Sequence, residues 1–332
     1  MTIAAPPAPV KAAPAALDAR WIAAAGAASI SLTSVFTKLA DTSPATAVFF
    51  RCLIALPPLA LLMLLEFRRH GMPTRRVVAI QAVGGVMLGI DFALWTQSIL
   101  MVGAGIATIL NSAQVLVVPL LAWAFYRDRI PLRFVLAVPL MFIGITLTSG
   151  LVGAAPAEGG GLLVGTLLGL ASGVAYAVYI IIVGRTSSRE RANSQVFIST
   201  AAAGIAGTAI GLLWGAVDFT PGWEAIGWLM VVGLSGQVLG WVLIGAALPK
   251  LSPSVGSSLL LLQPVLAVFF AMVLIGERPS PVQLLGCAIV VLGVWFVSQT
   301  AAPAPDRPDQ PDLPVEMAEP PAAVHAGGSV KV

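Results

Sequence analysis

The sequence predicts an all-α integral membrane protein with ten transmembrane helices, arranged as two inverted five-helix repeats. Three observations support this prediction: the scarcity of charge, a series of long apolar runs, and a similarity between the two halves of the chain. Of the 332 residues, 58% are hydrophobic and 10% are charged, whereas about 25% are charged in an average soluble protein. Because so few charges could not cover a water-exposed surface, lipid must be the solvent for most of the chain.

The apolar runs are long enough to cross a bilayer, which takes about 20 residues of α-helix. Continuous apolar stretches such as 115–124 and 259–273 favour helices over alternating strands. The expected spans are 21–40, 45–65, 77–98, 103–125, 132–150, 162–184, 195–217, 223–248, 253–275 and 282–299. Residues 1–19 and 301–332 are rich in Ala and Pro, and we expect them to form disordered tails.

Basic residues outside the apolar runs give the spans an orientation. Fifteen of the 18 Lys and Arg residues fall in the tails and in alternate loops, and the other three are Lys38, Arg51 and Arg278. By the positive-inside rule, the side with the excess is cytoplasmic. We therefore expect a multi-pass protein of the cytoplasmic (inner) membrane with both termini in the cytoplasm. Basic residues split among short loops make a poor nucleic-acid site, so no nucleic-acid partner is expected.

The two halves of the chain are similar at an offset of 149 residues. The corresponding pairs are Gln114 and Gln263, Asp128-Arg129 and Glu277-Arg278, and Gly144 and Gly293. Because each half holds an odd number of helices, the halves must cross the membrane in opposite directions, as an inverted repeat. The alternative is a chance similarity between two Leu/Val-rich sequences. The repeat predicts one five-helix domain over 20–150 and a second over 151–300.

The end of the second half carries a motif that runs from Gly276-Glu277-Arg278 to Gly286 and is followed by Val291-Leu292-Gly293-Val294. It resembles the closing signature of an EamA-type domain. Two such domains in tandem resemble the ten-helix exporters of the drug/metabolite transporter superfamily. Asp128 replaces the motif's Glu in the first half, and Ser29-Ile30-Ser31-Leu32 stands where many members have Trp-Gly. The chain is most similar to YddG-type amino-acid exporters, which implies outward transport by alternating access.

Polar side chains inside the spans are the candidates for a substrate site. An Asp at a helix centre costs about 2.5–3.5 kcal/mol to insert, so such residues persist where they face protein or water. We expect a cavity near the middle of the membrane, lined by Ser34, Asp91, Trp95, Asn111, Gln114, Tyr176, Tyr179, Gln237, Trp241 and Gln263. Amides beside backbone that is loosened by Pro119 and Pro264 can bind the charged groups of a zwitterion. The alternative role for these amides is hydrogen bonding between helices.

Asp91 is the only carboxylate well inside an expected span. It is the candidate proton-coupling group, and the alternative is a structural hydrogen-bond acceptor. Trp95 follows it four residues later on the same helical face, and Gln237 and Trp241 form a similar pair. These indole rings can stack on an apolar or aromatic substrate or belong to an aromatic belt at the membrane interface.

Glycines at every fourth position predict close helix packing. They are Gly165, Gly169 and Gly173 in one span, and Gly207, Gly211 and Gly215 in the next. They do not fit a phosphate-binding loop, because no strand precedes them.

The sequence contains no paired carboxylates, no metal-ligand spacing and no nucleophile with a positioned base. We therefore expect no enzyme activity, no cofactor and no bound metal. The scarcity of cations inside the spans argues against nucleotide-sugars and sugar phosphates, which need Lys or Arg. The expected function is a secondary transporter that exports small metabolites such as amino acids, including aromatic and apolar ones, and that works as a monomer. The alternatives are a carrier for multidrug or cationic-compound efflux and a passive metabolite channel.

Overall fold

The structure is a computed structural model that describes residues 18–127, 132–151, 156–184, 186, 189–247, 251 and 259–298. Helices make up most of the described residues, and none of these residues lies in a strand. Among them, seven helical segments are long and apolar enough to cross a membrane, and three shorter apolar helices accompany them. The prediction of an all-α fold of apolar helices is confirmed. Residues 1–17 and 301–332 of the predicted tails, Asp128-Arg129 and the start of the span predicted from 253 lie outside the described residues, whereas Ala19 already belongs to the first helix.

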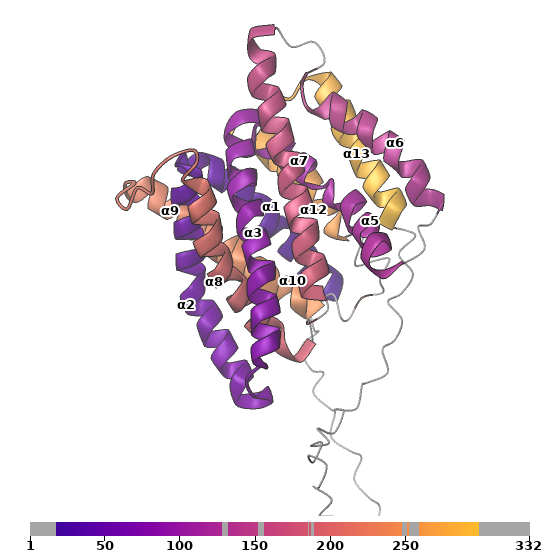
Figure 1. Ribbon diagram of the computed structural model, residues 1–332. Helices are drawn as coiled ribbons and strands as arrows, with labels where there is room; N and C mark the ends of the chain where they lie inside the picture. Colours follow the sequence, from indigo (N-terminus) through magenta and orange to yellow (C-terminus); the bar gives the residue numbers. More distant parts are fainter. Residues whose placement is uncertain are drawn as a thin grey trace, which may run out of the picture. The chain divides into compact units, whose positions relative to one another are not determined.

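The described residues of the first half form six helices, most of which are labelled in Figure 1. They are α1 (Ala19–Ala40), α2 (Pro44–His70), α3 (Arg75–Val102), α4 (Ala104–Asn111), α5 (Gln114–Tyr126) and α6 (Leu132–Thr148). Hydroxyl side chains cap the N-termini of α2 and α3. Ser43 and Thr74 accept hydrogen bonds from the N–H groups of Thr46 and Val77. Gly103, at φ 98°, separates α3 from α4 in a conformation that side chains disfavour.

The second half begins with α7 (Pro156–Gly184), the 3₁₀ turn η1 (Arg189–Arg191) and α8 (Ala192–Gly211). The span predicted over 223–248 consists of α9 (Trp223–Val231), the π-helix η2 (Val232–Gly240) and α10 (Trp241–Ala247). The last two helices are α12 (Leu262–Leu274) and α13 (Pro281–Ser298).

The span predicted over 103–125 is broken in the middle. The N–H of Ser112 donates to the backbone oxygens of Thr108 and Ile109, which tightens the last turn of α4. Helix α5 then starts at Gln114. The second half has a similar interruption, because residues 259–260 are helical, Leu261 lies in a turn and α12 follows. Leu261 stands 149 residues after Ser112, which is the same offset as that of the sequence similarity between the two halves.

Helices from the two halves pack directly on one another. Helix α3 lies against α7 and α8, α2 against α8, α4 against α12 and α6 against α13. Helix α1 contacts α12 and the α9–η2–α10 segment. The contact of α6 with α13 is visible at the edge of the bundle in Figure 1.

Glycines bring α3 and α8 into backbone contact. A Cβ atom on Gly89 would lie 2.5 Å from the backbone oxygen of Ala203, and one on Gly207 would lie 2.5 Å from that of Gly89. In α7, a Cβ atom on Gly165, Gly169 or Gly173 would also come within 2.5–2.8 Å of neighbouring helices. Since real Cβ contacts are longer, the prediction that these glycines allow close packing is confirmed.

Candidate functional site

Helices α3, α4 and α7 meet at a cluster of buried polar side chains. Asn111 is the last residue of α4, and its Nδ2 donates to Oδ1 of Asp91 on α3 and to Oγ of Ser172 on α7, both at 2.9 Å. Asp91 is 5% exposed and Ser172 is fully buried. The break between α4 and α5 places the Asn111 amide at the end of a helix, where it joins three helices.

A second group of polar side chains connects α2, α8 and the π-helix. Arg51 of α2 donates from Nη2 to Oε1 of Gln237 at 3.3 Å, and Gln237 donates from Nε2 to Oγ1 of Thr200 on α8 at 2.9 Å. Gln237 is 1% exposed. We refer to these two groups together as the polar layer, which consists of Arg51, Asp91, Asn111, Ser172, Thr200 and Gln237.

Two aromatic residues of α3, the helix that carries Asp91, lie against Arg51. The guanidinium carbon of Arg51 lies 3.8 Å from the ring centroid of Phe92 and 5.6 Å from that of Trp95. Such cation–π contacts stabilise a buried guanidinium. Arg51 and Asp91 interact electrostatically, although the ion pair found among the described residues is Lys38–Glu277 and does not involve them.

Arg51 belongs to the polar layer but is absent from the residues that the sequence predicts for the site, because its charge suggested a place outside the membrane. Arg51 lies seven residues after the start of α2, about 10 Å along the helix, and is 9% exposed. Arg51 adds one buried cation to an expected span, and the scarcity of such cations still predicts that phosphate-bearing substrates are disfavoured. The available signal was an Arg inside the apolar run Val48–Ile54, since ionisable residues at membrane depth commonly mark functional sites.

The structure brings several of the predicted site residues to the polar layer. Asp91, Asn111 and Gln237 belong to it, and Trp95 lies beside Arg51. Tyr176 and Tyr179 on α7 have ring centroids 5.6 Å apart and pack in the same cluster as Phe92. These placements leave the predicted roles in transport untested.

The other predicted site residues lie away from the hydrogen bonds of the polar layer, as far as the described residues show. Ser34 donates to the backbone oxygen of Ser31 within α1, and Ser31 in turn donates to that of Gln263 at 2.9 Å. Trp241 opens α10 and is half-buried. The Oε1 atom of Gln114 is buried and has no hydrogen-bond partner among the described residues.

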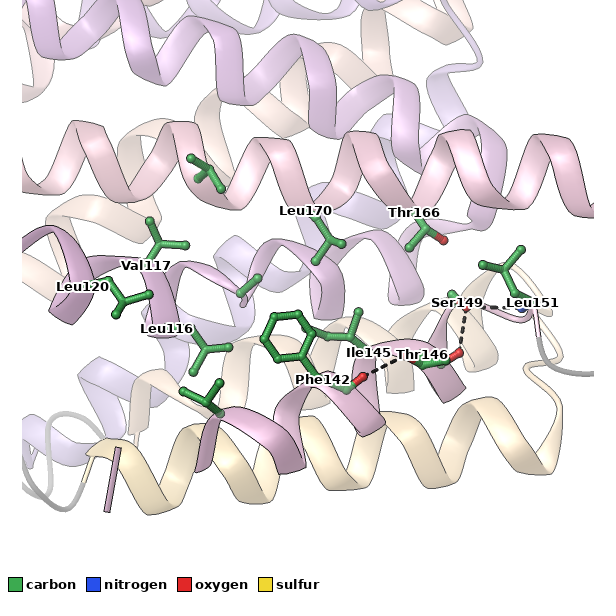
Figure 2. Close-up of a pocket in the computed structure, with 13 residues that line it drawn as sticks. Leu116, Val117, Leu120, Phe142, Ile145, Thr146, Ser149, Leu151, Thr166 and Leu170 are labelled. Atoms are coloured by element: carbon green, nitrogen blue, oxygen red, sulfur yellow. Dashed lines mark hydrogen bonds between the residues drawn. The ribbon is translucent and has the colours of Figure 1, made fainter. Parts of the chain in front are cut away.

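A separate cavity of about 420 Å³ lies between α5, α6 and α7 (Figure 2). Its walls are mostly aliphatic and aromatic, with residues such as Leu116, Leu170 and Phe142. The hydroxyls of Thr146 and Ser149 donate to backbone oxygens of their own helix. None of the predicted site residues lines this cavity, which offers a substrate apolar contact and few polar partners.

Two further carboxylates accept hydrogen bonds from the N-termini of helices that are distant from them in the sequence. Glu277, between α12 and α13, accepts from Lys38 Nζ at 2.6 Å and from the N–H of Ala104 at 2.7 Å, at the start of α4. Glu66 of α2 accepts from the N–H groups of Asn193 and Ser194 at the start of α8, both at 2.9 Å. A carboxylate is favourable at a helix N-terminus because the exposed N–H groups carry partial positive charge.

A model of the EamA-like transporter family matches residues 19–150 and 163–299 of this chain. The chain belongs to the EamA-like transporter family. As a family member it is a multi-pass membrane transporter, which sits in a lipid bilayer and binds a small-molecule substrate.

Two individual proteins resemble this EamA-family transporter. A Synechocystis sp. protein described as the uncharacterized transporter sll1319 is 29% identical over 241 residues, which is 69% of each chain. A solved structure titled "Crystal structure of protein" matches with a TM-score of 0.57 and 18% identity, over 86% of this chain and 99% of that chain. At that identity, the second match supports the fold alone.

Proposed function

We propose that this EamA-family transporter is a secondary carrier that exports amino acids across the cytoplasmic membrane, by alternating access between two inverted halves. The observation that supports the proposal is that both halves of the chain contribute residues to the polar layer. Arg51, Asp91 and Asn111 come from the first half of the chain, and Ser172, Thr200 and Gln237 come from the second. Carriers built from repeats bind their substrate near the membrane midplane, where the repeats meet.

The packing of the helices supports ten spans in two inverted repeats. If α4–α5 and α9–η2–α10 each count as one span, the contacts α2–α8, α4–α12 and α6–α13 each pair a helix with its counterpart. The contact of α3 with α7 likewise corresponds to that of the α9–η2–α10 segment with α1. A twofold axis in the membrane plane produces such pairs, and broken helices at corresponding positions are common beside the binding sites of such carriers.

The contacts between helix ends support the proposed topology. Glu277, Lys38 and Ala104 meet at one end of the bundle, and all three belong to loops or helix ends that the sequence places outside. Glu66 and Ser194 meet at the other end, which the sequence places in the cytoplasm. We propose that both termini lie on that second side, as the positive-inside rule predicts.

An amino acid suits the chemistry of the polar layer. A zwitterion needs a cationic partner for its carboxylate and an anionic partner for its ammonium group, and Arg51 and Asp91 interact electrostatically within one buried layer. Phe92 and Trp95 add aromatic surface beside them. We propose that Asp91 also couples transport to the proton gradient, and that the protein works as a monomeric carrier of the YddG type and not as an enzyme.

The test is counterflow in proteoliposomes that contain the purified protein, with labelled amino acids, sugar phosphates and cationic drugs, with and without a pH gradient. We expect saturable exchange of amino acids that responds to the pH gradient. Flux that does not saturate and shows no counterflow would indicate a passive channel. Exchange of cationic drugs alone would indicate an efflux carrier, and no exchange of any amino acid would reject the proposal.

A further inference from the structure

We propose that the Arg51 side chain is the receptor for the carboxylate group of the substrate. The inference rests on the proposed function, because it assigns a residue and a chemical class to the site of transport. It starts from the hydrogen-bonding capacity that Arg51 leaves unused in the structure.

A guanidinium group has five N–H donors and cannot give up its charge. The hydrogen bond recorded for Arg51 is the one from Nη2 to Gln237, and at 3.3 Å it is long. The Nε atom is buried and has no hydrogen-bond partner among the described residues. Since a buried donor without a partner is costly, the unpaired Nε–H is a strong candidate to donate a hydrogen bond to a substrate.

The surroundings hold the guanidinium in place. Arg51 is more than nine-tenths buried, its guanidinium carbon lies over the Phe92 ring, and Gln237 is itself anchored on Thr200. A fixed guanidinium whose Nε–H is unpaired among the described residues matches a carboxylate, which a guanidinium can bind through two parallel hydrogen bonds.

The charge of the polar layer favours a carboxylate over a phosphate. In its ionised form Asp91 balances the charge of Arg51, and no ion pair joins the two among the described residues. A zwitterion that binds Arg51 through its carboxylate and Asp91 through its ammonium group leaves the layer neutral. A phosphate dianion would add two negative charges beside Asp91, with one arginine to compensate them.

The experiment compares L-phenylalanine with L-phenylalaninamide, which lacks the carboxylate but keeps the ring and the amino group. Counterflow and ligand-induced change in melting temperature are both measured, for the wild type, Arg51→Gln, Arg51→Lys and Arg278→Gln. Arg278 is an exposed cation outside the apolar helices, so Arg278→Gln is the matched control for loss of one positive charge. Size-exclusion profile and melting temperature without ligand show whether each variant folds.

We expect the wild type and Arg278→Gln to exchange L-phenylalanine at least about tenfold better than the amide, because a charge-assisted, bidentate contact is lost with the amide. Arg51→Gln should exchange the two compounds equally poorly, and Arg51→Lys should recover part of the preference. Folded Arg51→Gln with wild-type preference would overturn the inference and leave amino-acid transport intact.

A second readout does not depend on transport or on the variants. L-Phenylalanine and phenylacetate, which share a carboxylate, should both raise the melting temperature of the wild type, and the amide should not. If the wild type exchanges no amino acid, the proposed function fails, yet stabilisation by the two carboxylates would still support a carboxylate receptor. Equal stabilisation by all three compounds, or by none, would overturn the inference.

Discussion

Two segments of the chain carry the same sequence pattern and differ in structure. Asp91 and Trp95 on α3, and Gln237 and Trp241 in the second half, are each a polar residue followed four positions later by Trp. Helix α3 is a regular α-helix of 28 residues, and its two residues of this pattern, Asp91 and Trp95, lie near Arg51. Gln237 lies in the π-helix η2, whereas Trp241 opens α10 after the π-helix has ended.

The difference lies in the turn of the backbone. In an α-helix, residues four apart share a face, whereas the i→i+5 hydrogen bonds of a π-helix change that spacing. The recorded contacts put Trp95 beside the guanidinium of Arg51, and those of Gln237 are with Arg51 and Thr200. The first half therefore presents its pair from a closely packed α-helix, and the second half presents its pair from an irregular segment. Single-turn π-helices are frequent at functional sites.

Of the variants considered, Asp91→Asn should have the largest effect on transport. The Asn side chain can still accept the hydrogen bond from Asn111, but it cannot take up and release a proton. We expect transport to lose its dependence on the pH gradient, while exchange without a gradient continues with weaker affinity because the ammonium group of the substrate loses its ionic partner. Asp41→Asn is the control, because Asp41 is exposed and its left-handed conformation suits Asn. Unchanged pH dependence in Asp91→Asn would make Asp91 a structural acceptor.

Gly89→Ala should destabilise α3 by about 2 kcal/mol, because the new Cβ would meet backbone atoms of α8 that have no room to move. The measurement is the unfolding free energy in detergent. Gly227→Ala on α9 is the matched control, since nothing lies within 4 Å of its added Cβ, and it should be neutral or slightly stabilising. Equal melting of the two variants would contradict the close contact of α3 with α8.

Gln237→Leu should destabilise the protein by about 1 kcal/mol, because Arg51 loses its acceptor and Thr200 loses a donor in a buried environment. The same change should weaken substrate binding, since the guanidinium is no longer held in place. Apparent affinity in counterflow, measured beside melting temperature, separates these two effects. A variant with wild-type affinity would show that Gln237 acts only in packing.

Trp241→Phe should have the smallest effect, with affinity unchanged and stability within about 0.5 kcal/mol. Trp95→Phe should weaken binding several-fold, because a smaller ring makes a weaker cation–π contact with Arg51. The comparison of the two variants in the same counterflow assay tests whether the two Trp residues differ as their surroundings do. An equal loss in both would restore the equivalence that the sequence pattern predicts.

Hydropathy alone predicts the helices and most of their extents, because the cost of exposing backbone in lipid leaves few alternatives. The sequence also identifies Asp91, Asn111 and Gln237 as polar side chains that are costly to insert into a membrane, and all three belong to the polar layer. It misses Arg51, since a count of charges by loop assigns a cation to the nearest end. Buried Glu66 is missed for a similar reason, because the expected span stops at residue 65 although α2 continues to His70.

Backbone irregularity was the least predictable feature. The π-helix η2 packs against α1 and α2, and no single residue marks it in the sequence. The break at Ser112 has no proline at the site, since Pro119 lies seven residues later. Both irregular segments contact helices that are distant in the chain, α12 and α7 for α4, and α1 and α2 for η2, and a local sequence pattern does not describe such contacts.

The cap that Glu277 provides for α4 has a consequence for how the two halves can vary in evolution. Gly103 has a φ of 98°, and a Cβ atom on it would lie 2.9 Å from Oε1 of Glu277. Any side chain at position 103 would therefore displace a carboxylate that lies 174 positions away in the chain. Across relatives of this transporter, a glycine at 103 and an acid at 277 should be kept or lost together, so we expect these two positions, one in each half, to covary.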